Sequence, residues 1–236
     1  MDFKKQRLLV IAPHPDDEVI GCGGLIAKIK EAGGCVFVLF LTVGNTRDFT
    51  KEGLSTAKER IKEIEAAAKF LKYDGWDLAF EGNDYHLRLD TLGQKALMDV
   101  IERDSIVSIE KVKPTIIAFT SFQSYNQDHR ITAFAAHASA RPQPKGAKHF
   151  VETVISYEEP ADGWTPMKNP APNFFVELSE DNLAAKTSAL SLYKSQARSA
   201  PSVRSQETIR ALSRLRGSQC GVNYAEGFTA YRITGK

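Results

Sequence analysis

The side chains best suited to chemistry follow a short apolar run near the start of the chain. Residues 7–12 read Arg-Leu-Leu-Val-Ile-Ala, and one histidine and three acids follow closely at His14, Asp16, Asp17 and Glu18. A buried parallel strand is a continuous aliphatic run, and ligands of open α/β sheets bind beyond the carboxyl ends of the strands. Because consecutive buried carboxylates need compensating positive charge, the pattern predicts a cation site.

His14 and Asp17 supply a nitrogen and an oxygen across a tight turn, and this pair suits a tetrahedral divalent metal such as zinc. Asp16 remains beside the pair, where its carboxylate could take a proton from a water activated by the metal. We therefore expect His14 and Asp17 to bind a metal and Asp16 to act as the base. Glu18 is interpreted as a helix-capping residue that complements the helix dipole.

A second polar cluster follows a later apolar run. Residues 114–120 predict a buried strand, and residues 124–130 read Ser-Tyr-Asn-Gln-Asp-His-Arg. Since strand-to-helix junctions on neighbouring parallel strands face the same edge of a sheet, His129 could approach His14 and Asp17. Two histidines and one carboxylate would complete a catalytic zinc site with an open position for water.

The elements that must position these residues alternate between helix and strand. Apolar runs predict strands at 7–12, 35–42, 77–80, 114–120 and 224–233, and helical spacing predicts helices at 18–32, 54–72, 91–110, 181–193 and 203–218. Residues 141–172 contain six prolines and predict loops with an added edge strand. The chain is thus predicted to form a single α/β domain over residues 1–236, Rossmann-like, with a mostly parallel sheet flanked by helices and a loop-rich C-terminal extension of the same domain.

Composition excludes several classes of function. The 236 residues carry a formal net charge of only +2, and Lys and Arg form no basic stripe, so we expect neither nucleic-acid nor membrane partners. The first apolar run breaks at Pro13, too early for a signal peptide or a membrane-spanning helix, which favours a cytoplasmic protein. The three cysteines form no C-x-x-C pair and predict neither a disulfide framework nor a cysteine zinc site. A homo-oligomer is compatible with the sequence.

The motifs His-Pro-Asp-Asp-Glu at 14–18 and Asp-His-Arg at 128–130 resemble those of the LmbE/PIG-L family of zinc-dependent N-acetylglucosaminyl deacetylases, over most of the chain. The resemblance implies a Rossmann-like fold, a Zn²⁺ cofactor and a small N-acetylated sugar or sugar conjugate as substrate. It implies His14, Asp17 and His129 as metal ligands and Asp16 as the general base.

Two further sites follow from the same resemblance. One branch of the family has His-x-Asp-His where this chain has Asn-Gln-Asp-His, so Asn126 stands in place of a histidine and the general acid is not identified. Asn126 could donate to an oxyanion or bind a sugar hydroxyl, and Asp128 could contribute to catalysis by orienting a site group. Arg60 and Glu63 match the family's Arg-x-x-Glu spacing, which predicts either a substrate-binding Arg60 or an ordinary surface ion pair.

Other functions remain open at this point. A magnesium-dependent phosphohydrolase would also place acids at strand ends, although two imidazoles favour zinc. A catalytically silent sugar- or nucleotide-binding module would keep the sheet without turnover. The remaining histidines, His86, His137 and His149, are interpreted as surface or packing residues. The glycines at 21–24 are interpreted as sites of close helix packing.

Overall fold

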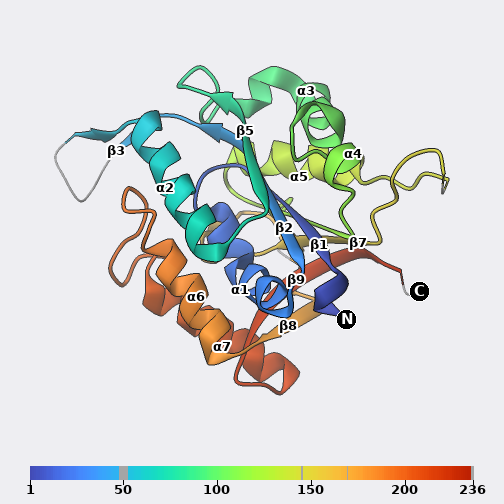
Figure 1. The fold of residues 1–236 in the computed structure, drawn as a ribbon. Coiled ribbons are helices and arrows are strands. Elements are labelled where there is room, and N and C mark those ends of the chain that lie inside the picture. The colour runs from blue at the N-terminus through green and yellow to red at the C-terminus, as the bar shows by residue number, and fades with distance from the viewer. Residues whose placement is uncertain (48–52, 145, 169, 235–236) are drawn as a thin grey trace.

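A seven-stranded sheet forms the centre of the protein (Figure 1), in the order β5-β2-β1-β6-β7-β9-β8. The computed structural model describes residues 1–47, 53–144, 146–168 and 170–234. The strands of the sheet are β1 (Arg7–Ala12), β2 (Cys35–Val43), β5 (Gly75–Glu81), β6 (Ile116–Phe119), β7 (Thr153–Tyr157), β8 (Phe174–Leu178) and β9 (Tyr224–Ile233). A small separate ribbon pairs β3 (Thr46–Arg47) with β4 (Leu54–Ser55).

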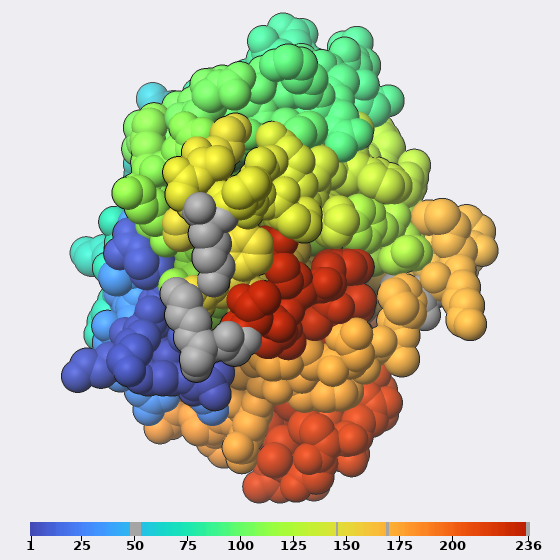
Figure 2. All heavy atoms as spheres, turned by 90° about the vertical axis from the view of Figure 1, so that its right-hand side faces the viewer, coloured from blue at the N-terminus to red at the C-terminus, as the bar shows by residue number. Residues whose placement is uncertain are grey.

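Most neighbours in the sheet are parallel. β1 pairs in parallel with β2 and β6, β2 with β5, and β6 with β7, whereas β9 is antiparallel to both β7 and β8. Figure 2 shows the C-terminal strand (red) between the segment around residue 150 (yellow) and the segment around residue 175 (orange). The predicted mostly parallel α/β sheet is confirmed, and strands from both ends of the chain share it.

Helices cover both faces of the sheet (Figure 1). They are α1 (Asp17–Ala32), α2 (Ala57–Leu71), α3 (Gly93–Asp99), α4 (Ile109–Val112), α5 (Gln127–Ser139), α6 (Glu180–Leu190) and α7 (Gln206–Cys220). Because side chains alternate along a strand, Leu8 and Val10 pack with α1, α2, α6 and α7, while Leu9 and Ile11 pack with α3, α4 and α5. No helix in the described ranges is long and apolar enough to cross a membrane.

The helix predicted over residues 91–110 is wrong in extent. A 3-10 turn (Leu89–Leu92), α3, a π turn (Val100–Asp104) and α4 replace it. The chain leaves the helix at Ser105 because Asp77 Oδ2 accepts hydrogen bonds from Ser105 Oγ at 2.7 Å and from the Ile106 N–H at 3.1 Å. A carboxylate on β5, distant in sequence, therefore ends a helix that local periodicity would continue.

The proline-rich segment also differs from its prediction. Its first strand, β7, lies inside the sheet between β6 and β9, and the edge strand β8 begins just after the segment, at Phe174. A 3-10 turn (Pro160–Trp164) follows β7. The segment thus extends the parallel sheet by one strand and then carries the chain past the strand ends, where the site is built.

α1 is broken at Cys22, whose backbone has the non-helical angles φ −144° and ψ 24°. The Gly24 and Leu25 N–H groups donate to the Glu226 carboxylate on β9, at 2.8 and 2.7 Å. Lys186 on α6 lies 2.6 Å from the same carboxylate, and both side chains are almost fully buried. Glu226 therefore caps the second half of α1 from within the protein, since unpaired helical N–H groups require an acceptor.

The glycines of α1 are sites of close packing, as predicted. A Cβ atom on Gly21 would lie 2.1 Å from Cδ2 of Tyr157, the residue that ends β7. Since the Tyr157 hydroxyl also donates to the Ile11 carbonyl at 3.1 Å, its ring has little freedom to move. We expect Gly21→Ala to lower the free energy of unfolding by about 1–3 kcal/mol in urea titrations.

Gly163 provides the control for this substitution, because no atom lies within 4 Å of a Cβ built there. Gly163→Ala is expected to change stability by less than about 0.5 kcal/mol. Equal effects of the two substitutions would show that contact with Tyr157 does not limit position 21.

Candidate metal centre and active site

The candidate site lies at the carboxyl ends of three neighbouring parallel strands. His14 follows β1, His129 lies in the first turn of α5 after β6, and Glu159 follows β7. β2 and β5 lie on one side of β1 while β6 and β7 lie on the other, so the chain order reverses between β1 and β6. Open α/β sheets bind their ligands at such switch points.

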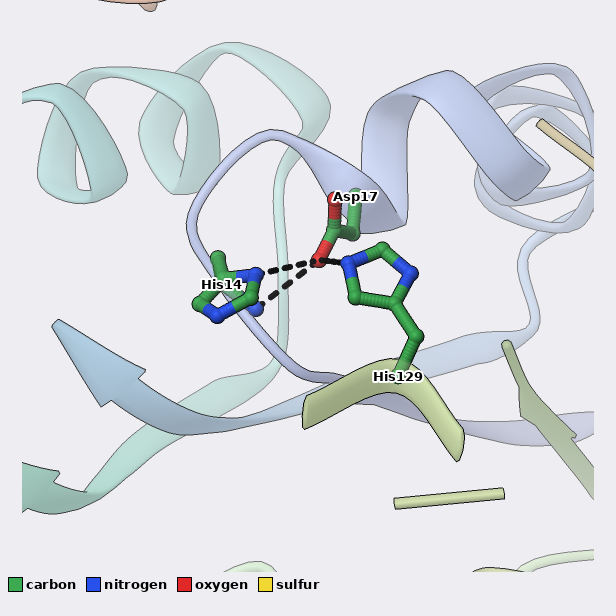
Figure 3. A group of neighbouring side chains, drawn as sticks. All are labelled: His14, Asp17 and His129. Carbon is green, nitrogen blue, oxygen red and sulfur yellow. Dashed lines mark hydrogen bonds and ion pairs between the residues drawn. The ribbon is translucent and has the colours of Figure 1, made fainter. Parts of the chain in front are cut away.

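The three predicted metal ligands come together there (Figure 3). The ligand atoms of His14, Asp17 and His129 all lie within 4.8 Å of one another, and the three residues are buried. Asp17 Oδ2 is 3.4 Å from His14 Nδ1 and 3.3 Å from His129 Nε2, and it accepts the backbone N–H of His14 at 2.9 Å. Two imidazoles and one carboxylate fit a tetrahedral metal with one position left for a ligand.

The other ring nitrogen of each histidine is held by a second polar group. His14 Nε2 lies 2.9 Å from Asp128 Oδ2, and His129 Nδ1 lies 3.0 Å from Thr120 Oγ1. Asp128 is fully buried, and its Oδ1 accepts the Leu89 N–H at 3.0 Å. Contacts of this kind fix the orientation and tautomer of metal-binding histidines. These contacts place Asp128 behind His14 as a partner of its second ring nitrogen, and each Asp128 oxygen has one hydrogen-bond partner in the protein.

The charges of the three candidate ligands support one another. Burial opposes the charged form of His14, but hydrogen bonds to Asp128 and Asp17 outweigh it and raise the pKa of His14. Burial likewise opposes ionisation of Asp17, but His129 and His14 hold the pKa of that carboxyl well below its usual range. Asp17 is thus kept in the ionised form that metal binding requires.

Asp16 lies next to the candidate ligands in an unusual backbone conformation. Its φ is 104°, in a region that non-glycine residues rarely adopt and that is often found at functional sites. The side chain is 1% exposed, and Oδ2 lies 3.3 Å from the Nε atom of Arg204. Burial raises the pKa of Asp16 to about 6, although the Arg204 charge opposes the rise. A carboxyl group with such a pKa is suited to accept and return a proton near neutral pH.

Glu18 lies in the first turn of α1, as predicted for a residue that complements the helix dipole, and it has further contacts that the sequence did not predict. It is fully buried, and its Oε1 accepts the hydroxyls of Tyr193 at 2.5 Å and Tyr73 at 3.0 Å. Its Oε2 accepts the Asp16 N–H at 3.2 Å. Burial raises the pKa of Glu18 to about 8. The prediction missed this role because both tyrosines are distant in sequence, and the contact supports the strained turn at Asp16.

Arg60 is not a surface ion-pair residue. It is 2% exposed, and its Nη1 donates to the Gly44 carbonyl at 3.1 Å and lies 3.4 Å from His86 Nε2. The carboxylate of Glu63 binds elsewhere and accepts the Ser195 N–H and hydroxyl at 2.8 and 2.6 Å. Through His86, whose ring contacts that of His14, Arg60 is thus next to the site, and Glu63 anchors a loop distant in sequence.

Asn126 lies at the N-terminus of α5, where its Oδ1 accepts the Asp128 N–H at 2.9 Å. It also lines a cavity of about 210 Å³ that opens onto the candidate metal centre at His129. Arg204 also lines this cavity, and the turn after β7 contributes Glu159 and Asp162. The cavity is thus large enough for a small polar group to reach the candidate metal centre.

Sequence reasoning missed three residues of this site. The ring of His86, predicted to be a surface or packing residue, lies edge-on to that of His14 with 5.1 Å between ring centroids, and burial lowers its pKa to about 3. Glu159 Oε1 is 3.7 Å from His129 Nδ1, and Arg204 contacts Asp16. None of the three belongs to a local sequence motif. The position of His86, between the strand predicted at 77–80 and the helix predicted at 91–110, was the single sequence feature that could have indicated a site residue.

The fold and the site define an α/β protein with a buried candidate metal centre, of the type that hydrolytic metalloenzymes use. The model of the PIG-L family, described as GlcNAc-PI de-N-acetylase, matches residues 9–140, which include all three candidate ligands and Asp16. The chain belongs to this family, and it is a hydrolytic enzyme of the deacetylase type.

Three relatives illustrate the similarity. The "uncharacterized deacetylase YaiS" of Escherichia coli is 26% identical over 81% of this chain and 92% of its own length. The diacetylchitobiose deacetylase of Thermococcus kodakarensis is 26% identical over 94% of this chain and 82% of its own length. The crystal structure of the conserved protein TT1542 from Thermus thermophilus superposes with a TM-score of 0.72 and 27% identity, covering 98% of this chain and 97% of that one.

Proposed function

We propose that this deacetylase is zinc-dependent and removes the N-acetyl group from an N-acetylglucosamine-type sugar or a conjugate of it. The convergence of His14, Asp17 and His129 beside the buried Asp16 carries the proposal. Membership of a de-N-acetylase family and the likeness to a diacetylchitobiose deacetylase support the choice of substrate class. The substrate is a small molecule, and the cavity at His129 is the proposed place of its acetamide.

The donor set supports zinc over magnesium. Magnesium prefers six oxygen ligands, whereas imidazole nitrogens with one carboxylate suit zinc. When bound, zinc would polarise the acetamide carbonyl and make a water more acidic. The contacts of Asp128 and Thr120 with the second ring nitrogens orient His14 and His129 for that role.

The reaction requires one proton to be moved twice. A water oxygen bonds to the acetamide carbon, the carbonyl electron pair moves to its oxygen, and Asp16 accepts a proton from the water. As the carbonyl re-forms, the carbon–nitrogen bond breaks and the Asp16 proton passes to the leaving nitrogen, which yields the free amine and acetic acid; the acid then loses its proton to solvent and leaves as acetate. Asn126 and Arg60 are proposed to bind the hydroxyls of the sugar, Asn126 through its side-chain amide.

The proposal is tested by acetate release from N-acetylglucosamine, short chitooligosaccharides, nucleotide sugars and glycoside conjugates. We expect release from at least one of them, loss of that release on treatment with a chelator, and recovery with stoichiometric Zn²⁺. A chelated protein that stays folded, judged by circular dichroism, is the control for unfolding.

Two outcomes would contradict the proposal. Recovery with Mg²⁺ but not Zn²⁺, together with phosphate release from phosphorylated sugars, would favour a phosphohydrolase. Sugar binding by the zinc-loaded protein, without acetate release from any compound, would favour a silent binding module.

A further inference from the structure

We propose that Arg204 is a catalytic residue whose guanidinium donates a hydrogen bond to the acetamide oxygen as that oxygen gains negative charge. This inference rests on the proposed deacetylation and adds a residue from a segment outside both sequence motifs. Hydrogen-bond donors aimed at a developing oxyanion are among the largest contributors to catalysis of acyl transfer.

The position of Arg204 supports this role. The cavity that opens at His129 is also lined by Arg204, together with Tyr125 and Asn126. His129 and Arg204 therefore border the same space, which an acetamide would occupy to reach the candidate metal centre. Arg204 Nε also lies 3.3 Å from Asp16 Oδ2, so the proposed base and the proposed donor are side by side.

The guanidinium of Arg204 has N–H groups that form no hydrogen bond with the described residues. Its Nη1 donates to the Gln196 side-chain oxygen at 2.9 Å, and no described residue accepts a hydrogen bond from Nη2. The contact of Arg204 with Asp16 is an ion pair and not a hydrogen bond, and Asp16 Oδ2 has no hydrogen-bond partner among the described residues. Arg204 is thus attracted to Asp16 by charge and retains N–H groups for a substrate oxygen.

The loop that carries Arg204 is held in place at several points. Its Ser195 binds Glu63 of α2, and Tyr193 at its start binds Glu18 of α1. The Arg198 N–H donates to the Arg204 carbonyl at 3.2 Å and closes the loop on itself. Because electrostatic stabilisation is most effective when the donor is already in position, these anchors favour a catalytic role over a mobile surface arginine.

Other polar groups of the cavity fit the role less well. The Arg198 guanidinium donates to the carbonyls of Ala197 and Ser195 and thereby holds its own loop. Glu159 and Asp162 are carboxyl groups, which repel an oxyanion whenever they are ionised. The neighbouring Asp16 charge raises the pKa of Arg204, so the guanidinium keeps all its protons and acts as a hydrogen-bond donor while Asp16 moves the proton.

The test compares zinc-loaded wild type with Arg204→Met and Arg204→Lys. With Arg204→Met we expect kcat to fall by about 10²- to 10³-fold and KM to change by less than about threefold, because the interaction strengthens only in the transition state. Affinity for a tetrahedral phosphonamide analogue of the acetamide should fall by the same factor as kcat/KM, while affinity for the product amine is retained. Arg204→Lys should recover part of the loss, since it keeps one charged donor.

Zinc content and thermal unfolding are measured for every variant. The matched control for loss of an arginine is Arg210→Met on α7, which breaks an exposed ion pair with Glu180. Acetate release by the wild type comes first, and its absence at full zinc loading would reject the proposed function and this role with it. With that release established, three results would overturn the role of Arg204 alone: a kcat within threefold of wild type, equal weakening of analogue and amine, or a loss matched by the loss of zinc.

Discussion

Replacement of Asp16 by asparagine is expected to lower kcat for acetate release by about 10²- to 10⁴-fold, the usual contribution of a general acid–base group. Asparagine has the same shape but cannot accept the proton of the attacking water. Because Asp16 is not one of the three candidate ligands, the variant should bind zinc with unchanged stoichiometry, and metal analysis beside steady-state kinetics checks both expectations.

The control for Asp16→Asn is Asp181→Asn, an equivalent change at an exposed position in the first turn of α6, which should leave kcat unchanged. Full turnover by zinc-loaded Asp16→Asn would remove Asp16 as the base. The buried Glu159, which lies 3.7 Å from His129, would then be the next carboxylate to examine.

Glu226→Gln is expected to destabilise the protein by about 3 kcal/mol, because it leaves the buried Lys186 ammonium without its carboxylate. The same change weakens the cap on Gly24 and Leu25 where α1 is broken. Urea unfolding followed by circular dichroism measures the effect.

Two comparisons isolate the buried pair. Glu180→Gln removes an exposed partner of Arg210 and should cost no more than about 1 kcal/mol. Adding Lys186→Met to Glu226→Gln should restore part of the stability, because no unpaired charge then remains buried. A Glu226→Gln effect as small as that of Glu180→Gln would contradict the proposed role of the pair.

The sequence by itself determined most strands of the sheet and the principal candidate ligands. Continuous aliphatic runs are typical of parallel strands buried on both faces, and their ends can be read directly from the chain. His14, Asp16 and Asp17 lie within one turn, so their proximity depends on local geometry alone. His129 could be added because carboxyl ends of neighbouring parallel strands lie at one edge, and motifs like those of a known family supported the same choice.

Only the tertiary structure decided which distant groups surround that turn. Arg204, Glu159 and His86 reach the site from three different loops, and loop paths depend on long-range contacts such as those of Glu63 with Ser195. The break of the predicted helix at Ser105 has the same origin, a carboxylate distant in sequence. Local periodicity indicates which face of a helix or strand is buried, but it carries no information on contacts with residues distant in sequence. The charged groups around Asp16 come from such distant residues.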